Sequence, residues 1–151
     1  MKSVVDFDPA KLKRVRLAAG LSAADVAKAI GSTPGTVGRW ENGRGAPSPR
    51  LFVALADVLA VPKERLLVPL ADEADLATLR TRAGLRQEDV ADALEVQSSD
   101  VSEMEQGTAA VRDEWGVVLS TLYEVPLERL ARARAVTEVR WRERFEGKRG
   151  K

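Results

Sequence analysis

Apolar and polar residues do not alternate with a sustained period of two anywhere in the chain, and aromatic residues make up only 5% of it. Both features disfavour β-strands. Short segments with helix-capping residues at their ends fill most of the chain instead. We therefore expect an all-α protein, and in the first half the pattern predicts helices at 9–19, 22–30, 33–40, 48–59 and 62–67.

Capping residues support these boundaries. Asp8 precedes Pro9, and proline is favoured in the first turn of a helix. Ser22 and Asp25 have the spacing of a capping box, in which each residue bonds the backbone of the other. Gly31 follows the second predicted helix, where a glycine commonly ends a helix.

The chain contains an internal duplication. A shift of 64 residues aligns Leu12–Leu66 with Leu76–Leu130 without a gap, and 20 of the 55 aligned pairs are identical. The second copy predicts helices near 73–83, 87–94, 98–105 and 113–123, and a last helix from 126 into the tail. We predict two modules at 1–69 and 70–131, followed by a basic helical tail at 132–151.

Each predicted module has a core of regularly spaced apolar residues. We expect Trp40 to belong to this core more than to the exposed surface. The other predicted core residues of the first module, each with a counterpart in the second, are Leu12, Val15, Leu21, Val26, Ile30, Val37, Leu55 and Leu59.

Charge is unevenly distributed although the formal net charge is only +1. Residues 1–69 carry +5, residues 70–131 carry −9 and residues 132–151 carry +5. A basic surface suits a polyanion such as nucleic acid, whereas an acidic one suits a protein partner or solubility.

Composition also limits the chemistry. The chain has no cysteine and no histidine, which removes thiolate metal sites, the commonest metal ligand and the commonest catalytic base. We expect no enzyme activity, no metal and no cofactor. No apolar stretch is long enough to span a membrane, and residues 1–8 have no secretory pattern, so we expect a cytoplasmic protein without membrane contact. The basic surfaces, which suit nucleic acid, extend this expectation to association with the nucleoid.

The second and third predicted helices are joined only by Gly31 and Ser32, which is typical of a helix-turn-helix. The segment AGLSAADVAKAIGSTPGTVGRWENG resembles the core of the phage-repressor (Cro/Xre-type, Cro/CI-like) helix-turn-helix domain. The resemblance covers residues 10–67 closely and 74–130 less closely. It implies two tandem five-helix, lambda-repressor-like domains and a bacterial transcriptional regulator that binds operator DNA, often as a dimer.

The resemblance also implies roles for single residues. Arg16 with Glu41, and Arg80 with Glu105, are expected to form structural ion pairs. Arg39 can contact a guanine edge or a phosphate. Gly35 and Gly38 of the third predicted helix either allow its backbone to approach the DNA closely or leave the helix with few base contacts. The implied DNA-facing positions are Thr33, Pro34, Gly35, Thr36, Gly38, Arg39, Asn42 and Arg44, with Lys28 and Arg50 at the rim.

The second module differs at these positions. Asp100 and Glu103 replace Thr36 and Arg39, so we expect this acidic, degenerate copy to bind DNA poorly by itself. It is either a protein-interaction or dimerisation copy or a second DNA-binding copy, since carboxylates can accept a hydrogen bond from cytosine. Its corresponding positions are Gln97, Ser98, Ser99, Asp100, Ser102, Glu103, Gln106 and Thr108.

The tail leaves three alternatives open. Val136, Val139, Trp141 and Phe145 form a narrow apolar edge among arginines. The tail is a dimerisation helix, a basic arm on DNA phosphates, or a segment that neutralises the acidic second module.

Two functions follow from these observations. The first is a sequence-specific regulator that binds double-stranded DNA as a homodimer and places the recognition helix Thr33–Trp40 in the major groove. The alternative is a protein-interaction adaptor or antitoxin-like partner, which uses the acidic second domain or the C-terminal helix and contacts little DNA.

Overall fold

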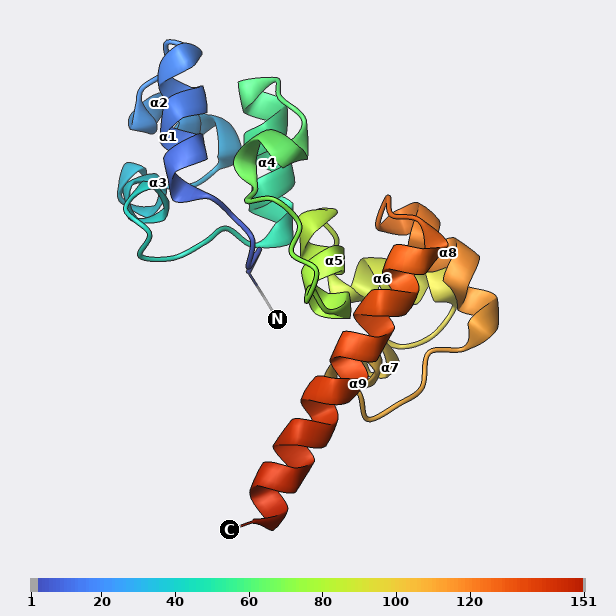
Figure 1. Ribbon diagram of the computed structural model, residues 1–151. Helices are drawn as coiled ribbons and strands as arrows, with labels where there is room; N and C mark the ends of the chain where they lie inside the picture. The colour runs from blue at the N-terminus through green and yellow to red at the C-terminus, as the bar shows by residue number, and fades with distance from the viewer. Residues whose placement is uncertain (1–2, 151) are drawn as a thin grey trace. The chain divides into compact units, whose positions relative to one another are not determined.

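The computed structural model describes residues 3–150; Met1 and Lys2 of the first predicted module and Lys151 of the tail lie outside the described residues. Within that range every regular element is helical, and an isolated bridge joins Phe7 to Leu67. The chain divides into two compact units, Met1–Leu70 and Ala71–Lys151, each with its own set of helices (Figure 1). The prediction of an all-α tandem fold is confirmed.

The first unit contains five helical elements. The fifth is a 3₁₀-helix and not an α-helix, because the chain becomes extended at Leu67, where it pairs with Phe7 ahead of Pro69. The elements are α1 (Pro9–Ala18), α2 (Ala23–Ile30), α3 (Pro34–Glu41), α4 (Pro49–Leu59) and η1 (Lys63–Leu66).

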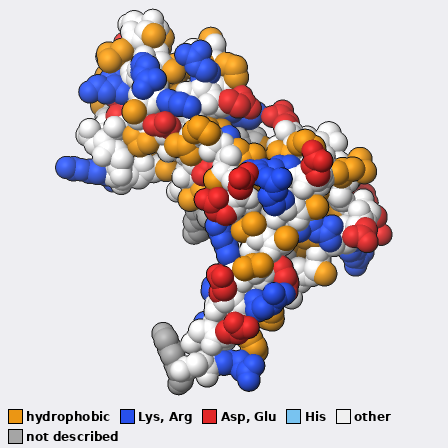
Figure 2. Space-filling model, viewed as in Figure 1, with side chains coloured by type: hydrophobic (Ala, Val, Ile, Leu, Met, Phe, Trp, Pro, Cys, Tyr) orange, Lys and Arg blue, Asp and Glu red, His pale blue; other side chains and the backbone are white. Residues whose placement is uncertain are grey.

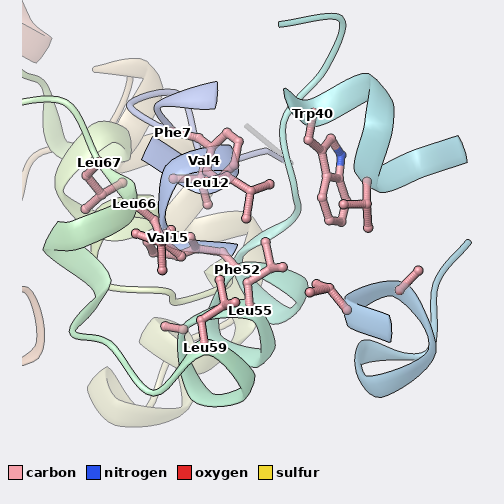
Figure 3. Packing of buried hydrophobic residues seen from close by; sticks show 14 residues of the cluster. Val4, Phe7, Leu12, Val15, Trp40, Phe52, Leu55, Leu59, Leu66 and Leu67 are labelled. Carbon is pink, nitrogen blue, oxygen red and sulfur yellow. The ribbon is translucent and has the colours of Figure 1, made fainter. Parts of the chain in front are cut away.

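The core of the first unit lies between these helices. Leu12, Val26, Val37 and Leu55 are fully buried, as predicted, whereas Leu21 and Ile30 are only partly buried at its edge. Trp40 is 3% exposed and belongs to the core. Figure 3 shows the buried side chains of this core, among them Leu12, Trp40 and Leu55, coming from separate elements.

The segment before α1 is part of the same core, which the sequence pattern did not predict. Val4 is fully buried and Phe7 is 6% exposed. The Val4 N–H donates to the Pro47 carbonyl at 2.9 Å, and the Asp8 N–H donates to the Leu66 carbonyl at 2.9 Å. The segment from Val4 to Asp8 is therefore held against Pro47, ahead of α4, and against Leu66 at the end of η1.

The second unit repeats this plan with three differences. The first helix begins at Leu76, because Asp75 caps it by accepting from the Thr78 N–H at 2.9 Å. The predicted helix 113–123 is divided into a 3₁₀ turn and an α-helix, since no side chain caps its start. The last helix continues through the tail, as predicted. The elements are α5 (Leu76–Arg82), α6 (Gln87–Leu94), α7 (Ser98–Gln106), η2 (Asp113–Trp115), α8 (Gly116–Leu122) and α9 (Leu127–Arg149).

Backbone conformation matches between the two copies even where the residues differ. Gly31 and its counterpart Glu95 both end a helix in the left-handed region, with φ of 72° and 58°. Ala60 and Glu124 form a second such pair, with φ of 54° and 55°. This conformation is unfavourable for residues with a Cβ atom, so the fold imposes it on Glu95.

Candidate nucleic-acid interface

Local hydrogen bonds fix the turn between α2 and α3. The Asp25 N–H donates to Ser22 Oγ at 3.0 Å, and the Ser22 N–H donates back to Asp25 Oδ2 at 2.9 Å. Hydrogen bonding of the carboxylate by Ser22, first of all by its backbone N–H, lowers the pKa of Asp25. After Gly31 ends α2, the Thr33 hydroxyl accepts from the Thr36 N–H at 3.2 Å and caps α3. The start of α3 is thereby placed directly beside the end of α2.

One side of α3 is buried and the other is at the surface. Val37 and Trp40 pack into the core, which fixes the rotation of the helix about its axis. All the DNA-facing positions that the resemblance implies are at the surface. Thr36 and Gly38 are half-buried, and the exposed ones are Lys28, Thr33, Pro34, Gly35, Arg39, Asn42, Arg44 and Arg50.

An ion pair joins α3 to α1. Arg16 Nε lies 2.7 Å from Glu41 Oε2, and its Nη2 donates to Glu41 Oε1 at 2.8 Å. Arg16 Nη1 also donates to the Leu21 carbonyl at 2.9 Å, ahead of α2. The hydrogen bond with Glu41 raises the pKa of Arg16. A single guanidinium therefore holds the end of α3 and the start of α2 in one geometry.

The cations of this surface are available to a ligand. Among residues 3–150, no carboxylate lies at salt-bridge distance from Lys28, Arg39, Arg44 or Arg50. Figure 2 shows several Lys and Arg side chains on the visible face of the first unit. Such unpaired charges suit the phosphates of a nucleic acid.

The two glycines of α3 face open space. A Cβ atom built at Gly35 or Gly38 would meet no heavy atom of the described chain within 4 Å. Their φ values are not positive, so the backbone does not require glycine there. Packing within the protein therefore gives no reason for either glycine. The hydroxyls of Thr33 and Thr36 lie 3.0 Å apart and bond each other.

The corresponding surface of the second unit is acidic. Asp100 and Glu103 of α7 are exposed, and Asp100 also accepts from the Gln97 N–H at 2.8 Å to cap that helix. Gln97, Ser98, Ser99, Gln106 and Thr108 are exposed as well, and Ser102 is half-buried. This surface keeps polar groups but has lost the cation that Arg39 supplies in the first unit.

The ion pair of the second unit repeats the first. Arg80 Nε lies 2.6 Å from Glu105 Oε2, and Arg80 Nη1 donates to the Leu85 carbonyl at 2.9 Å. Gln87 Nε2 donates to Glu105 Oε1 at 3.0 Å. Gln87 therefore points towards the end of α7 and adds a bond that Ala23 cannot make in the first unit.

Several arginines of the tail form ion pairs with acidic residues elsewhere in the second unit. Arg132 lies 3.1 Å from Asp72, Arg134 lies 3.5 Å from Asp113, and Arg140 lies 2.6 Å from Asp75. Thr137 of the same helix is buried, and its hydroxyl accepts from the Leu76 N–H at 3.2 Å. The contacts favour the neutralising alternative for the first part of the tail.

Sequence reasoning did not identify the surroundings of Arg144 and Lys148. Both line an open cavity of about 310 Å³ beside the C-terminal end of α7. The sequence pattern indicates a helix through these residues but contains no signal for the element against which it packs. Among residues 3–150, no helix is long and apolar enough to cross a membrane, and no group of three or more acidic residues could hold a metal ion.

Comparisons with known proteins agree with this geometry. A helix-turn-helix family model matches residues 12–66, and a second helix-turn-helix domain model matches residues 74–138. No curated protein and no solved structure matches the chain. The two matches together cover both copies of the repeat, including α2–α3 and α6–α7. The chain is a tandem helix-turn-helix DNA-binding protein of the Cro/Xre type.

Proposed function

We propose that the protein is a sequence-specific transcriptional regulator that binds double-stranded DNA with the segment Thr33–Trp40, the capping residue and most of α3, in the major groove. The observation that carries this proposal is the exposed edge of α3, whose orientation is fixed by Trp40 in the core and by the Arg16–Glu41 pair. An α-helix fits the major groove, and residues near its start can contact base edges there.

Within this proposal the exposed residues divide into two groups. Arg39 extends from α3 and contacts a guanine edge or a phosphate. Asn42 and Arg44 follow α3 and contact phosphates, with Lys28 and Arg50 at the rim. Gly35 and Gly38 allow the helix backbone to approach the bases closely, because no side chain of residues 3–150 lies within 4 Å of a Cβ built at either position.

The protein would act on its operator as a homodimer. Two half-sites one helical turn apart are about 34 Å from centre to centre, and a two-fold protein matches a palindromic site. Analytical ultracentrifugation with and without the DNA site tests this part. A complex that holds one chain per palindrome would contradict it.

Recovery of bound genomic fragments, followed by fluorescence anisotropy on the recovered site, tests the function. Arg39→Ala should lose roughly 1–3 kcal/mol of binding free energy. Arg14→Ala is the matched control, since Arg14 is an exposed arginine of α1 outside the proposed interface. Equal losses in the two variants would contradict the role of Arg39.

The acidic surface of the second unit supports a second candidate, a protein-interaction adaptor. Asp92, Glu95, Asp100 and Glu103 are all exposed on α6, on α7 or between them. A basic partner protein would complement them. This candidate predicts a stoichiometric protein complex and no DNA affinity above the non-specific level at ~150 mM salt. Specific DNA binding under those conditions would exclude it as the sole function.

A further inference from the structure

A cavity lies between the C-terminal end of α7 and the distal part of α9, which runs from Trp141 to the end of the helix at Arg149. Every residue that lines the cavity belongs to the second unit. The volume of the cavity is about 310 Å³, and it is partly open to solvent. The polar and aromatic side chains that line it come from both helices and the turn after α7. They include Gln106, Thr108, Trp141, Arg144, Phe145 and Lys148.

Direct packing fixes the walls of this cavity. Gly107 has a φ of 81°, and a Cβ atom there would lie 2.7 Å from Trp141 Cβ, so α9 packs closely against the turn after α7. Arg144 Nη2 donates to the Gln106 carbonyl at 2.5 Å. The rings of Trp141 and Phe145 stack with centroids 5.3 Å apart. The distal part of α9 therefore has a defined position beside α7.

The cavity is cationic although the domain around it is acidic. Among residues 3–150, no carboxylate lies at salt-bridge distance from Arg144 or Lys148. The carboxylate that lines the cavity, Glu105, is 2.6 Å from Arg80 and thus already paired. Two unpaired cations beside neutral polar groups suit an anionic ligand.

The repeat indicates which anion fits. Gln106 and Thr108 align with Asn42 and Arg44 in the repeat. In the first unit, Asn42 and Arg44 are the proposed phosphate contacts. The second copy has lost the arginine at Thr108, but α9 brings Arg144 and Lys148 to the same end of α7. The first unit has no such helix, because its fifth element ends at Leu66.

We propose that the second unit binds the phosphate backbone of a DNA duplex through this cavity, with cations that α9 supplies in place of those lost from α7. The proposal rests on the proposed function, since it adds a backbone contact to the same complex. Asp100 and Glu103 oppose insertion of α7 into the groove. The contact is therefore to phosphates and independent of base sequence.

The salt dependence of binding by the full chain tests this proposal. Each phosphate contact contributes about 0.9 to the slope of log K against log salt concentration. R144A/K148A should lower the magnitude of that slope by about 1–2 and weaken binding about tenfold near 100 mM salt. The matched control R132A/R142A removes the same charge from exposed positions of the same helix outside the cavity, and it should change the slope less.

The outcomes separate the two proposals. Equal slopes for R144A/K148A and R132A/R142A, in a protein whose binding still depends on Arg39, would overturn the cavity contact alone. Absence of DNA binding by the wild-type chain would overturn the proposed function together with this contact.

A second measurement locates the contact. The chain has no cysteine, so T108C introduces a unique site for a photo-activated cross-linker. We expect T108C to cross-link to the operator duplex, and E128C, at an exposed position in the first turn of α9, not to do so. Cross-linking from E128C but not from T108C would overturn the proposed placement.

Discussion

Replacing Gly38 with alanine should stabilise the first unit while weakening its binding to DNA. Gly38 lies inside α3, where alanine is favoured over glycine by about 1 kcal/mol. A Cβ atom there would meet no neighbouring atom of residues 3–150 within 4 Å, so the new methyl group has no steric cost against this part of the free protein. In a domain of this size the gain corresponds to a rise of roughly 4–8 °C in Tm.

The same methyl group would occupy the space through which the helix is proposed to approach the DNA. Overpacking of a close contact costs typically ~1–3 kcal/mol, so we expect the Kd for the operator to rise by about fivefold to about 150-fold. Gly35→Ala should weaken binding in the same way with a smaller gain in stability, because Gly35 lies in the first turn of α3.

Calorimetry and fluorescence anisotropy on the same samples measure both effects of Gly38→Ala. Gly147→Ala is the control, because Gly147 lies in α9 and also has open space at its Cβ position. A Gly38→Ala protein that is more stable and binds the operator as tightly as the wild type would refute the close approach. Absence of any stabilisation would refute the helix-propensity argument.

Three further predictions concern the second unit. Glu105→Ala removes the carboxylate that pairs with the nearly fully buried Arg80, so it should lower the free energy of unfolding by about 3–5 kcal/mol. A loss below about 1 kcal/mol in urea titrations would contradict the structural role of the pair. Burial alone would raise the pKa of Asp75, but hydrogen bonds from Thr78 and the nearby Arg140 together lower it. The ionised Asp75 therefore contributes its full stabilisation above the unfolded pKa of about 3.9, and this stabilisation is lost as pH falls through the lower folded pKa. The unfolding free energy of Asp75→Ala should accordingly fall less than that of the wild type in this acid range. Glu95 ends α6 with a positive φ, and Gly31 has the corresponding place in the first copy, so Glu95→Gly should raise the unfolding free energy by about 1 kcal/mol. An equal rise for Glu95→Ala would show that backbone strain is not the cause.

Local signals in the sequence predicted most of the first unit. Ser22 with Asp25 and Thr33 marked helix starts because their side chains bond backbone groups within three residues, and no distant contact is needed for that effect. The internal repeat carried these boundaries into the second unit. It failed where the copies differ locally, as at Asp75, which begins its helix later than the alignment indicated.

Long-range packing could not be predicted from the same signals. Val4 and Phe7 precede the first helix without a periodic pattern, and they are buried only because the chain returns beside them near Pro47 and Leu66. The position of the distal α9 depends on the contact of Trp141 with the turn after α7, which has no counterpart in the first copy. The sequence therefore predicted the exposed edge of α3 better than the cavity beside α7.

The specificity profile of Arg39→Ala tests the central claim most directly. The binding free energies of the wild-type chain and of Arg39→Ala are measured on every single-base-pair variant of the recovered operator. If α3 lies in the major groove with Arg39 on a guanine, the variant loses discrimination at one base pair and keeps it elsewhere. The same loss on every sequence, or an unchanged profile, would contradict the claim that α3 reads the duplex through this side chain.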